Sequence, residues 1–198
     1  MPTTVVAAAN RAELALELRD VHQQIEDVRL HLQRLMFGID DAGFLWRPEA
    51  NRWSISECLV HLNVTASLYV SAIDQALLAA CPTLSPDDLP RRGWLGRWML
   101  NTLEPPVKRR FPAPAVFVPG SGRPLDEVVP EFIHWQDQVQ ERLLASRNID
   151  LWRTKVKSPA VPVLKFSLGE TFAIIAAHER RHLAQAAAVK QSAGFPRP

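Results

Sequence analysis

The stretch WSISECLVHL at residues 53–62 decides how this chain of 198 residues folds. It places an aromatic residue before Ser54 and sets Glu57 three positions after that serine, at the start of an aliphatic run. A serine followed three residues later by a glutamate is a capping box, in which each side chain bonds to a backbone N–H group that the first helical turn leaves without a partner. The pattern therefore predicts that a helix begins at Ser54.

The same arrangement returns at residues 166–170, which read FSLGE. Ser167 is the expected cap of this second start, and Glu170 follows it by three residues. In both places the aromatic residue before the serine suits the apolar contact that fixes the chain's entry into a capped helix. The recurrence favours two helical hairpins in a pseudo-symmetric arrangement.

Apolar residues recur every three or four positions in four segments, which predicts four long helices packed through their apolar sides. Asn10 and Gly38 are the expected boundaries of the first helix, Pro82 is the expected stop of the second, and Pro130 restricts the first turn of the third. The fourth helix is expected from Ser167 to about Gln191, and loops are expected at residues 39–53 and after Asn148. The apolar positions are Leu14, Leu18, Val21, Ile25, Val28, Leu32 and Leu35; Ile55, Leu59, Leu62, Ala66, Tyr69, Ile73 and Leu77; and Val128, Phe132, Trp135, Val139 and Leu143.

Residues 82–124 form an insert between the second and third helices that differs in composition from the rest of the chain. It carries nine of the sixteen prolines, which excludes a long regular element. We expect it to lie outside the four-helix core, as a cover over a site or as an interaction surface, because its tryptophans are too apolar to be left in water as one patch. One short amphipathic piece remains, with Trp94, Leu95, Trp98, Met99 and Leu103 on one side. The insert is also the most basic part of the chain, through Arg91, Arg92, Arg97, Lys108, Arg109 and Arg110.

Length and composition are those of one globular domain spanning 1–198, with an apolar fraction of 47%. The formal charge of +2 favours neither nucleic acid nor a membrane as a partner. No segment approaches the roughly 20 apolar residues of a membrane span, and the apolar run at 5–9 is too short for a secretory signal. The two cysteines, Cys58 and Cys81, lie in and at the end of one helical pattern, too far apart for a disulfide. A reducing cytoplasm is the expected compartment.

His178 and His182 lie four residues apart and therefore on one face of the predicted fourth helix. Because that face follows the core spacing, both imidazoles are expected to point into the bundle, where an unpaired imidazole is costly and a metal ion is a good partner. His61, beside Leu62 in the second helix, supplies a third imidazole. Three protein ligands leave one position open for water or substrate, as in catalytic sites. The other histidines, His22, His31 and His134, are interpreted as surface or boundary residues.

Residues 178–182 also match the H-E-x-x-H pattern of zinc proteases, in which the glutamate is a general base. Such enzymes take a third ligand downstream, and residues 183–198 contain no His, Asp, Glu or Cys. A zinc protease is therefore a disfavoured alternative.

Together the two histidine segments resemble the DinB-like superfamily of helical bundles, which includes the YfiT-type proteins. Residues 53–62 are similar to that family's W-S-x-x-E-x-L-x-H entry into its second helix. Residues 178–185, HERRHLAQ, are similar to its closing H-x-x-x-H helix with a following glutamine. The resemblance implies an all-α, up-down-down-up four-helix bundle with a three-histidine site for one divalent ion, usually zinc or nickel. The insert at 82–124 is longer than the family's usual connection.

The resemblance also implies one of the activities known in that family. These are thiol S-transfer with bacillithiol or mycothiol, a mycothiol-dependent isomerisation, and metal-dependent hydrolysis. The leading hypothesis is a metal-dependent enzyme that binds a thiol or water at the open position and acts on a small electrophilic substrate. Homodimers are frequent among bundles of this resemblance. Glu57, one turn before His61, is a candidate to orient that imidazole, in competition with its role in the cap. Glu179 and Gln185 are candidates to hold the incoming nucleophile, and the arginines of the insert to receive the carboxylates of a thiol.

Two alternatives stay open at this point. One is a metal- or ligand-binding bundle without turnover, with a stress-response or partner-binding role. The other is that the histidines are purely structural and the basic insert is an interaction surface. The sequence shows no nucleophile or acid–base pair beyond the metal site that would separate them from an enzyme.

Overall fold

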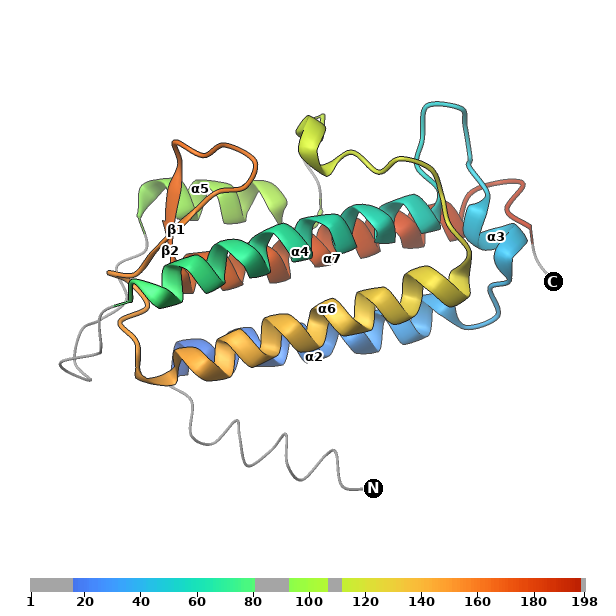
Figure 1. The fold of residues 1–198 in the computed structure, drawn as a ribbon. Coiled ribbons are helices and arrows are strands. Elements are labelled where there is room, and N and C mark those ends of the chain that lie inside the picture. Colours follow the sequence, from blue (N-terminus) through green and yellow to red (C-terminus); the bar gives the residue numbers. More distant parts are fainter. Residues whose placement is uncertain (1–15, 81–92, 107–111, 197–198) are drawn as a thin grey trace, which may run out of the picture.

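The computed structural model describes residues 16–80, 93–106 and 112–196, and over these residues the protein is mostly helical (Figure 1). The prediction of an all-α four-helix bundle is confirmed, and none of the described helices is long and apolar enough to cross a membrane. The four long helices are α2 (Leu16–Met36), α4 (Ile55–Leu78), α6 (Leu125–Ala145) and α7 (Leu168–Lys190). Shorter elements are α3 (Asp41–Leu45), α5 (Trp94–Leu103), the 3-10 turns η1 (Ala115–Phe117) and η2 (Ser146–Asn148), and the strands β1 (Lys155–Lys157) and β2 (Lys165–Ser167). The predicted cap Asn10, the predicted stop Pro82, and Leu14, Cys81, Arg91, Arg92, Lys108, Arg109 and Arg110 lie outside the described residues.

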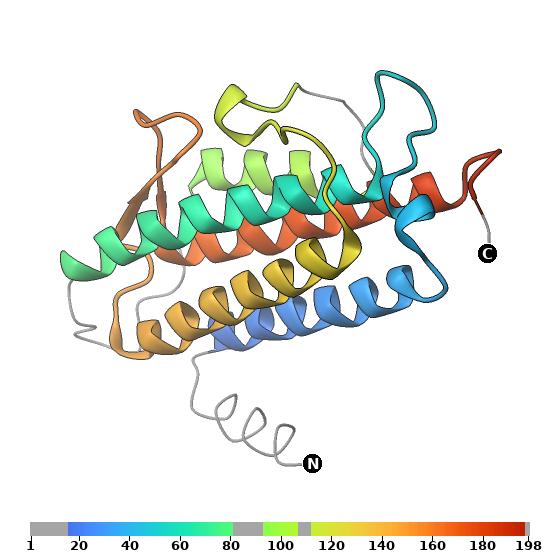
Figure 2. The same cartoon turned by 45° about the vertical axis from the view of Figure 1, so that its right-hand side comes forward.

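The long helices run up, down, down and up, so that α4 and α6 are parallel and so are α2 and α7 (Figures 1 and 2). Two contacts at different heights along each parallel pair establish these directions. They are Ser56 with Arg123 and Asp74 with Arg142 between α4 and α6, and Gln24 with Arg180 and Leu35 with Lys190 between α2 and α7.

The long insert follows from this topology. Two consecutive helices that run parallel need a connection that travels back along the whole bundle, whereas antiparallel neighbours need only a short loop. Helix α5 makes part of the return, because it begins beside the start of α7 and ends beside the middle of that helix. The predicted short amphipathic piece of the insert is this helix.

Both predicted capping boxes are present. Glu57 N donates to Ser54 Oγ over 3.1 Å while Ser54 N donates to Glu57 Oε2 over 2.9 Å. The pair Ser167 and Glu170 repeats these bonds at the start of α7, over 3.2 and 2.9 Å. Each box satisfies two backbone N–H groups that a buried helix start would otherwise leave unpaired.

The apolar core between the long helices consists of two clusters. One gathers residues of α2, α4, α6 and α7 near the α3 end, among them Leu32, Leu59, Phe132 and Leu183. The other lies toward the hairpin and includes Ile25, Ile73, Leu143 and Phe172, together with Leu100 of α5 and Phe117 of η1. The predicted apolar positions of α2, α4 and α6 that the structure describes therefore pack in or against this core.

Helix α5 is held on α7 by polar contacts at both of its ends. The Gly93 N–H donates to Glu170 Oε1 over 2.7 Å, so that one carboxylate serves the starts of two helices. At the other end Arg181 Nη1 donates to the Thr102 carbonyl over 3.0 Å, and Arg180 pairs with Glu104. Helix α5 thus lies along the outside of α7 rather than between the four long helices.

The close approach of α5 to Glu170 requires a glycine, which gives a first testable prediction. A Cβ at position 96 would lie 2.2 Å from Glu170 Oε1 and 2.5 Å from its Cδ. Gly96→Ala should therefore lower the free energy of unfolding by roughly 1–3 kcal/mol, as overpacking does, by displacing Glu170 from its caps. Gly120→Ala is the matched control because no atom lies within 4 Å of its added Cβ. Urea unfolding of the two variants measures the difference, and equal stability would contradict this docking of α5.

Two segments predicted to be loops contain regular structure. Within 39–53 lies α3, whose cap is Asp40, a side chain that accepts from Gly43 N over 2.9 Å. After Asn148 the chain forms an antiparallel hairpin in which Val156 pairs with Phe166, and both side chains are buried. The prediction of loops was wrong there because elements of three to five residues are too short to show a period.

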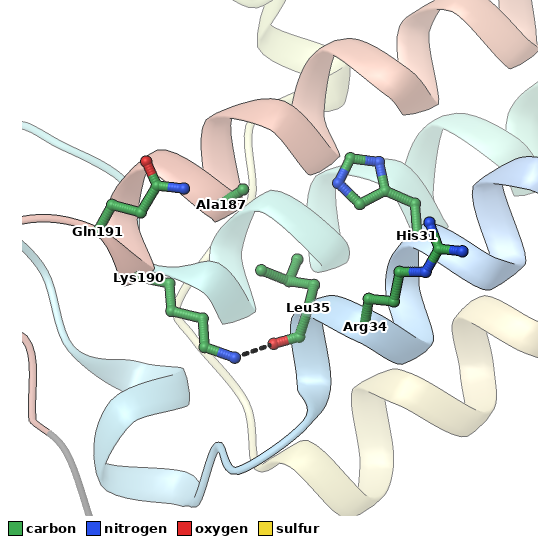
Figure 3. Close-up of a pocket in the computed structure, with 6 residues that line it drawn as sticks. All are labelled: His31, Arg34, Leu35, Ala187, Lys190 and Gln191. Carbon is green, nitrogen blue, oxygen red and sulfur yellow. Dashed lines mark hydrogen bonds between the residues drawn. The ribbon is translucent and has the colours of Figure 1, made fainter.

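The C-terminal ends of α2 and α7 meet at a polar contact (Figure 3). Helix α2 ends as predicted before Gly38, whose φ is +67°. Lys190 Nζ donates to the carbonyls of Leu35 and Phe37, each over 2.7 Å, and so satisfies groups that the end of α2 leaves open. The adjoining pocket of about 330 Å³ lies between α2 and α7, and none of the predicted metal ligands lines it. Its lining residues are His31, Arg34, Leu35, Ala187, Lys190 and Gln191.

Candidate metal centre

Helices α4 and α7 bring His61, His178 and His182 together. The three side chains offer nitrogen atoms that all lie within 4.8 Å of one another, and His61 Nε2 lies 3.1 Å from His178 Nε2. Nitrogen ligands at about 2.0–2.1 Å from a tetrahedral zinc ion are about 3.4 Å apart, so only small side-chain adjustments separate this cluster from a coordination site. The structure therefore assembles the three histidines that the sequence pattern predicted.

A backbone carbonyl orients His61. Its Nδ1 lies 2.6 Å from the Phe117 carbonyl, which can only accept, so Nδ1 carries the proton. In the neutral ring Nε2 then has a free lone pair, and it points at His178. An imidazole whose second nitrogen donates to a carbonyl is the usual arrangement of a metal-binding histidine.

Trp53 covers the cluster on another side. Its ring centroid lies 5.0 Å from that of His61 and 5.8 Å from that of His182, to which it is nearly parallel at 27°. The Nδ1 atom of His182 is buried and has no hydrogen-bond partner among the described residues. An orphaned nitrogen beside two other imidazoles is the kind of buried polar atom that a bound cation would satisfy. The donor set thus fits a divalent first-row metal ion.

Burial keeps the three imidazoles neutral. It lowers the pKa of His61 and, more strongly, lowers the pKa of His178 to about 3, where the charges of His61 and Arg181 act in the same direction. Burial also lowers the pKa of His182 well below its usual value, with further contributions from His178, His61 and Arg181. The neutral ring is the form that binds a metal ion.

These shifts predict an acid-labile metal-free protein. An unfolded histidine has a pKa near 6.5 and folded His178 one of about 3, so between these values the unfolded state binds more protons. The free energy of unfolding should fall as pH drops through this window, and His178→Gln should make the fall shallower. Glu179, whose pKa burial raises to about 7, acts in the opposite direction, so the comparison must be between variants.

Urea unfolding of the metal-free protein at several pH values measures this dependence. His134→Gln, on an exposed position of α6, is the control because its imidazole lies outside the cluster. If His178→Gln and His134→Gln show the same slope with pH, burial does not hold the cluster neutral.

The sequence pattern predicts that the histidines point into the space between the four long helices. In the structure they point away from that space. The groups that cover them, Trp53 and the Phe117 carbonyl, come from outside those helices. The interior position is occupied instead by Glu179, which is only 3% exposed and accepts from Gln136 Nε2 of α6 over 2.6 Å. His22, interpreted from the sequence as a surface or boundary residue, is likewise buried at 5% exposure.

The three predicted helper residues separate in the structure. Glu57 is occupied by its cap and by an ion pair with Arg47, and the acceptor of His61 Nδ1 is the Phe117 carbonyl rather than Glu57. Glu179 faces α6 and not solvent. Only Gln185 adjoins the cluster, where its side chain partly offsets the lowering of the pKa of His182.

Sequence reasoning missed Phe117 and Arg181 as neighbours of the site. Nothing in a proline-rich insert marks one carbonyl as a histidine partner. Arg181 lies between the two helical histidines in the sequence, and its charge reaches both of them. Its position directly before His182 was the available signal.

Cys58 is not a further ligand of this group. It lies one turn before His61 in α4, but its side chain is fully buried, and burial raises the pKa of its thiol. A thiol that stays protonated is a poor metal ligand and a poor nucleophile.

Comparison with known proteins identifies the family of the chain. No curated protein and no solved structure shows a significant match to the chain. The family model of the DinB superfamily matches residues 21–186, which include all three histidines and all four long helices apart from their extreme ends. With most of its length matched, the chain belongs to the DinB superfamily.

Proposed function

We propose that the protein is a metal-dependent enzyme that activates a low-molecular-weight thiol, or a water molecule, against a small electrophilic substrate. The observation that carries this proposal is a cluster of three neutral imidazoles with no carboxylate among the ligands. His61, His178 and His182 would hold one divalent ion, zinc or nickel. Such an ion, with one coordination position open, lowers the pKa of the thiol or water that it binds.

The surrounding residues support binding of an anion at the open position. His178, Gln185 and Arg181 are each only partly buried, so the cluster is partly exposed to solvent on their side. Arg181 adds a positive charge whose influence extends to His178 and His182. Trp53 and Phe117 cover the cluster and exclude water, which strengthens the attraction between these charges and an anionic sulfur or oxygen.

The chain's own acids take no part in this proposal. The carboxylates of Glu57 and Glu179 are bound by Arg47 and Gln136, away from the open side. A thiol is therefore the favoured nucleophile, because a thiol bound to a metal ion needs no general base near neutral pH. The H-E-x-x-H protease alternative fails here because it requires the glutamate to reach the metal-bound face.

Cobalt substitution tests the proposal. Protein purified without an affinity tag should contain about one first-row divalent ion per chain, as one three-imidazole site predicts. After replacement by Co²⁺, addition of 2-mercaptoethanol should produce a sulfur-to-cobalt charge-transfer band. A cobalt spectrum that does not change when thiol is added, but changes with pH near neutrality, would favour water as the nucleophile. The protein would then be a hydrolase.

A second candidate is a metal-binding protein without turnover. It is favoured by one observation, that among the described residues no carboxylate or thiol reaches the histidine cluster as an acid, base or nucleophile. A cobalt spectrum insensitive to thiols, to pH and to small anions would support this candidate, because it shows a closed coordination sphere.

A further inference from the structure

The outer face of α5 exposes two tryptophans beside an arginine. Trp94 and Trp98 lie four residues apart and are 75% and 52% exposed, and Arg97 is exposed between them. The opposite side of the helix is the one that packs, with Gly96 and Leu100 buried. Neighbouring indole rings that are exposed to water form an apolar patch, and such patches often mark a surface that binds a partner.

The β1–β2 hairpin exposes lysines in the same way. Its register sets Lys157 directly opposite Lys165, while Val156 and Phe166 are buried on the other face. Like charges directly opposite each other destabilise a hairpin, so an anion that bridged the two ammonium groups would offset a cost already present. At the turn between the strands Val163 is 83% exposed.

Helix α5 and the β1–β2 hairpin lie next to each other in both views (Figures 1 and 2). Leu95 and Met99 of α5 pack against the same apolar cluster as Leu164 of the hairpin, so the outer sides of both elements face away from that cluster. The start of α5 also bonds to Glu170, which follows the end of β2 by three residues. Figures 1 and 2 show both elements on the side of α4 and α7 that lies away from α2 and α6.

We define the basic aromatic face by Trp94, Arg97, Trp98, Lys157, Val163 and Lys165. Its charged members are all cationic, and Lys157 and Lys165 make no ion pair within the described part of the chain. A partner of this face must therefore carry negative charge. It must also offer an apolar region for the tryptophan and valine side chains.

We propose that this face docks on an anionic phospholipid surface. Tryptophan concentrates at the boundary between headgroups and acyl chains, where its ring is apolar and its N–H finds water or phosphate. Lysine and arginine near such a surface are attracted by its negative potential. Valine at an exposed turn can enter the boundary layer without leaving a polar group unpaired.

Other occupants fit the face less well. A symmetric dimer through this face would bring each copy's lysines and arginine close to those of the other, because the same patch meets itself across a two-fold axis. Nucleic acid would satisfy the charges, but Val163 offers no group that reads a base or contacts a phosphate. The near-neutral charge of the whole chain had predicted no membrane partner, yet docking depends on the local charge of one face.

Vesicle binding by the full chain tests the proposal. The native protein should co-float with vesicles of phosphatidylcholine mixed with phosphatidylglycerol at low salt, with a blue shift of tryptophan emission, and should not bind phosphatidylcholine alone. Replacing Lys157→Gln together with Lys165→Gln should weaken partitioning about 30-fold, from roughly tenfold for each 1.4 kcal/mol and about 1 kcal/mol per charge. Replacing Trp94→Ala together with Trp98→Ala should also weaken it and abolish the blue shift.

The controls lie on another part of the surface. Phe37→Ser removes a side chain that is 85% exposed, and Arg34→Gln removes an exposed charge from α2, and neither should change partitioning. All variants should keep their helical circular dichroism and their metal content. The proposal is overturned if the native protein ignores the anionic vesicles, binds neutral ones equally well, or binds undiminished in both double variants. It is also overturned if the double variants convert a native dimer to monomers, or if they lose only binding to a DNA duplex.

Discussion

Replacing His178 by alanine should abolish stoichiometric metal binding while leaving the bundle folded. His178 contacts both other members of the cluster, since its Nε2 lies 3.1 Å from His61 Nε2 and its ring centroid 4.6 Å from that of His182. Loss of an outer partner of a metal ligand costs about 10–100-fold in affinity, and loss of one ligand out of three should cost more. Elemental analysis of tag-free protein and competition with a chelator measure the loss.

The fold should survive this change because His178 belongs to neither of the apolar clusters that pack the long helices together. Burial lowers the pKa of His178, which means that the folded chain disfavours the charged form of this ring and gains no ion pair from it. The helical circular dichroism of His178→Ala at room temperature should therefore match that of the native chain. His134→Ala is the matched control and should retain its metal. Undiminished metal content in His178→Ala would contradict the assignment of the metal site. Loss of the helical signal would show that the histidine cluster is needed for folding.

Replacing Phe132 by alanine should have the largest effect on stability. This side chain of α6 is 1% exposed and lies in the apolar cluster formed by α2, α4, α6 and α7. Truncation of a buried phenylalanine to alanine lowers the free energy of unfolding by about 3–5 kcal/mol, because apolar contacts are lost and a cavity remains. For a chain of this size that corresponds to a fall in melting temperature of roughly 6–20 °C.

An exposed phenylalanine provides the control for this measurement. Phe37 is 85% exposed, and Phe37→Ala should change the free energy of unfolding by no more than about 0.5 kcal/mol. Below its melting transition Phe132→Ala should still bind metal in full, because the histidines lie on α4 and α7 and are covered by Trp53 and Phe117. Loss of metal in the folded variant would show that the core of the bundle and the histidine cluster are coupled.

The starts of α4 and α7 and the identity of the three histidines that form the cluster could be predicted from the sequence alone. A capping box joins groups only three residues apart, so the sequence spacing alone predicts the pairs Ser54–Glu57 and Ser167–Glu170. His178 and His182 are likewise one turn apart on a helix of known period. The end of α2 at Gly38 followed from the same kind of local signal.

Only the tertiary structure decided which way the site faces and what surrounds it. Phe117 and His61 are 56 positions apart and His61 and His178 are 117 apart, so no local spacing records their meeting. The core spacing of α7 could not say whether His178 or its neighbour Glu179 would turn toward α6. That choice depends on Gln136, which supplies the hydrogen bond that a buried carboxyl requires. The Phe117 carbonyl of η1 then reaches His61, because parallel α4 and α6 force the insert back along the bundle.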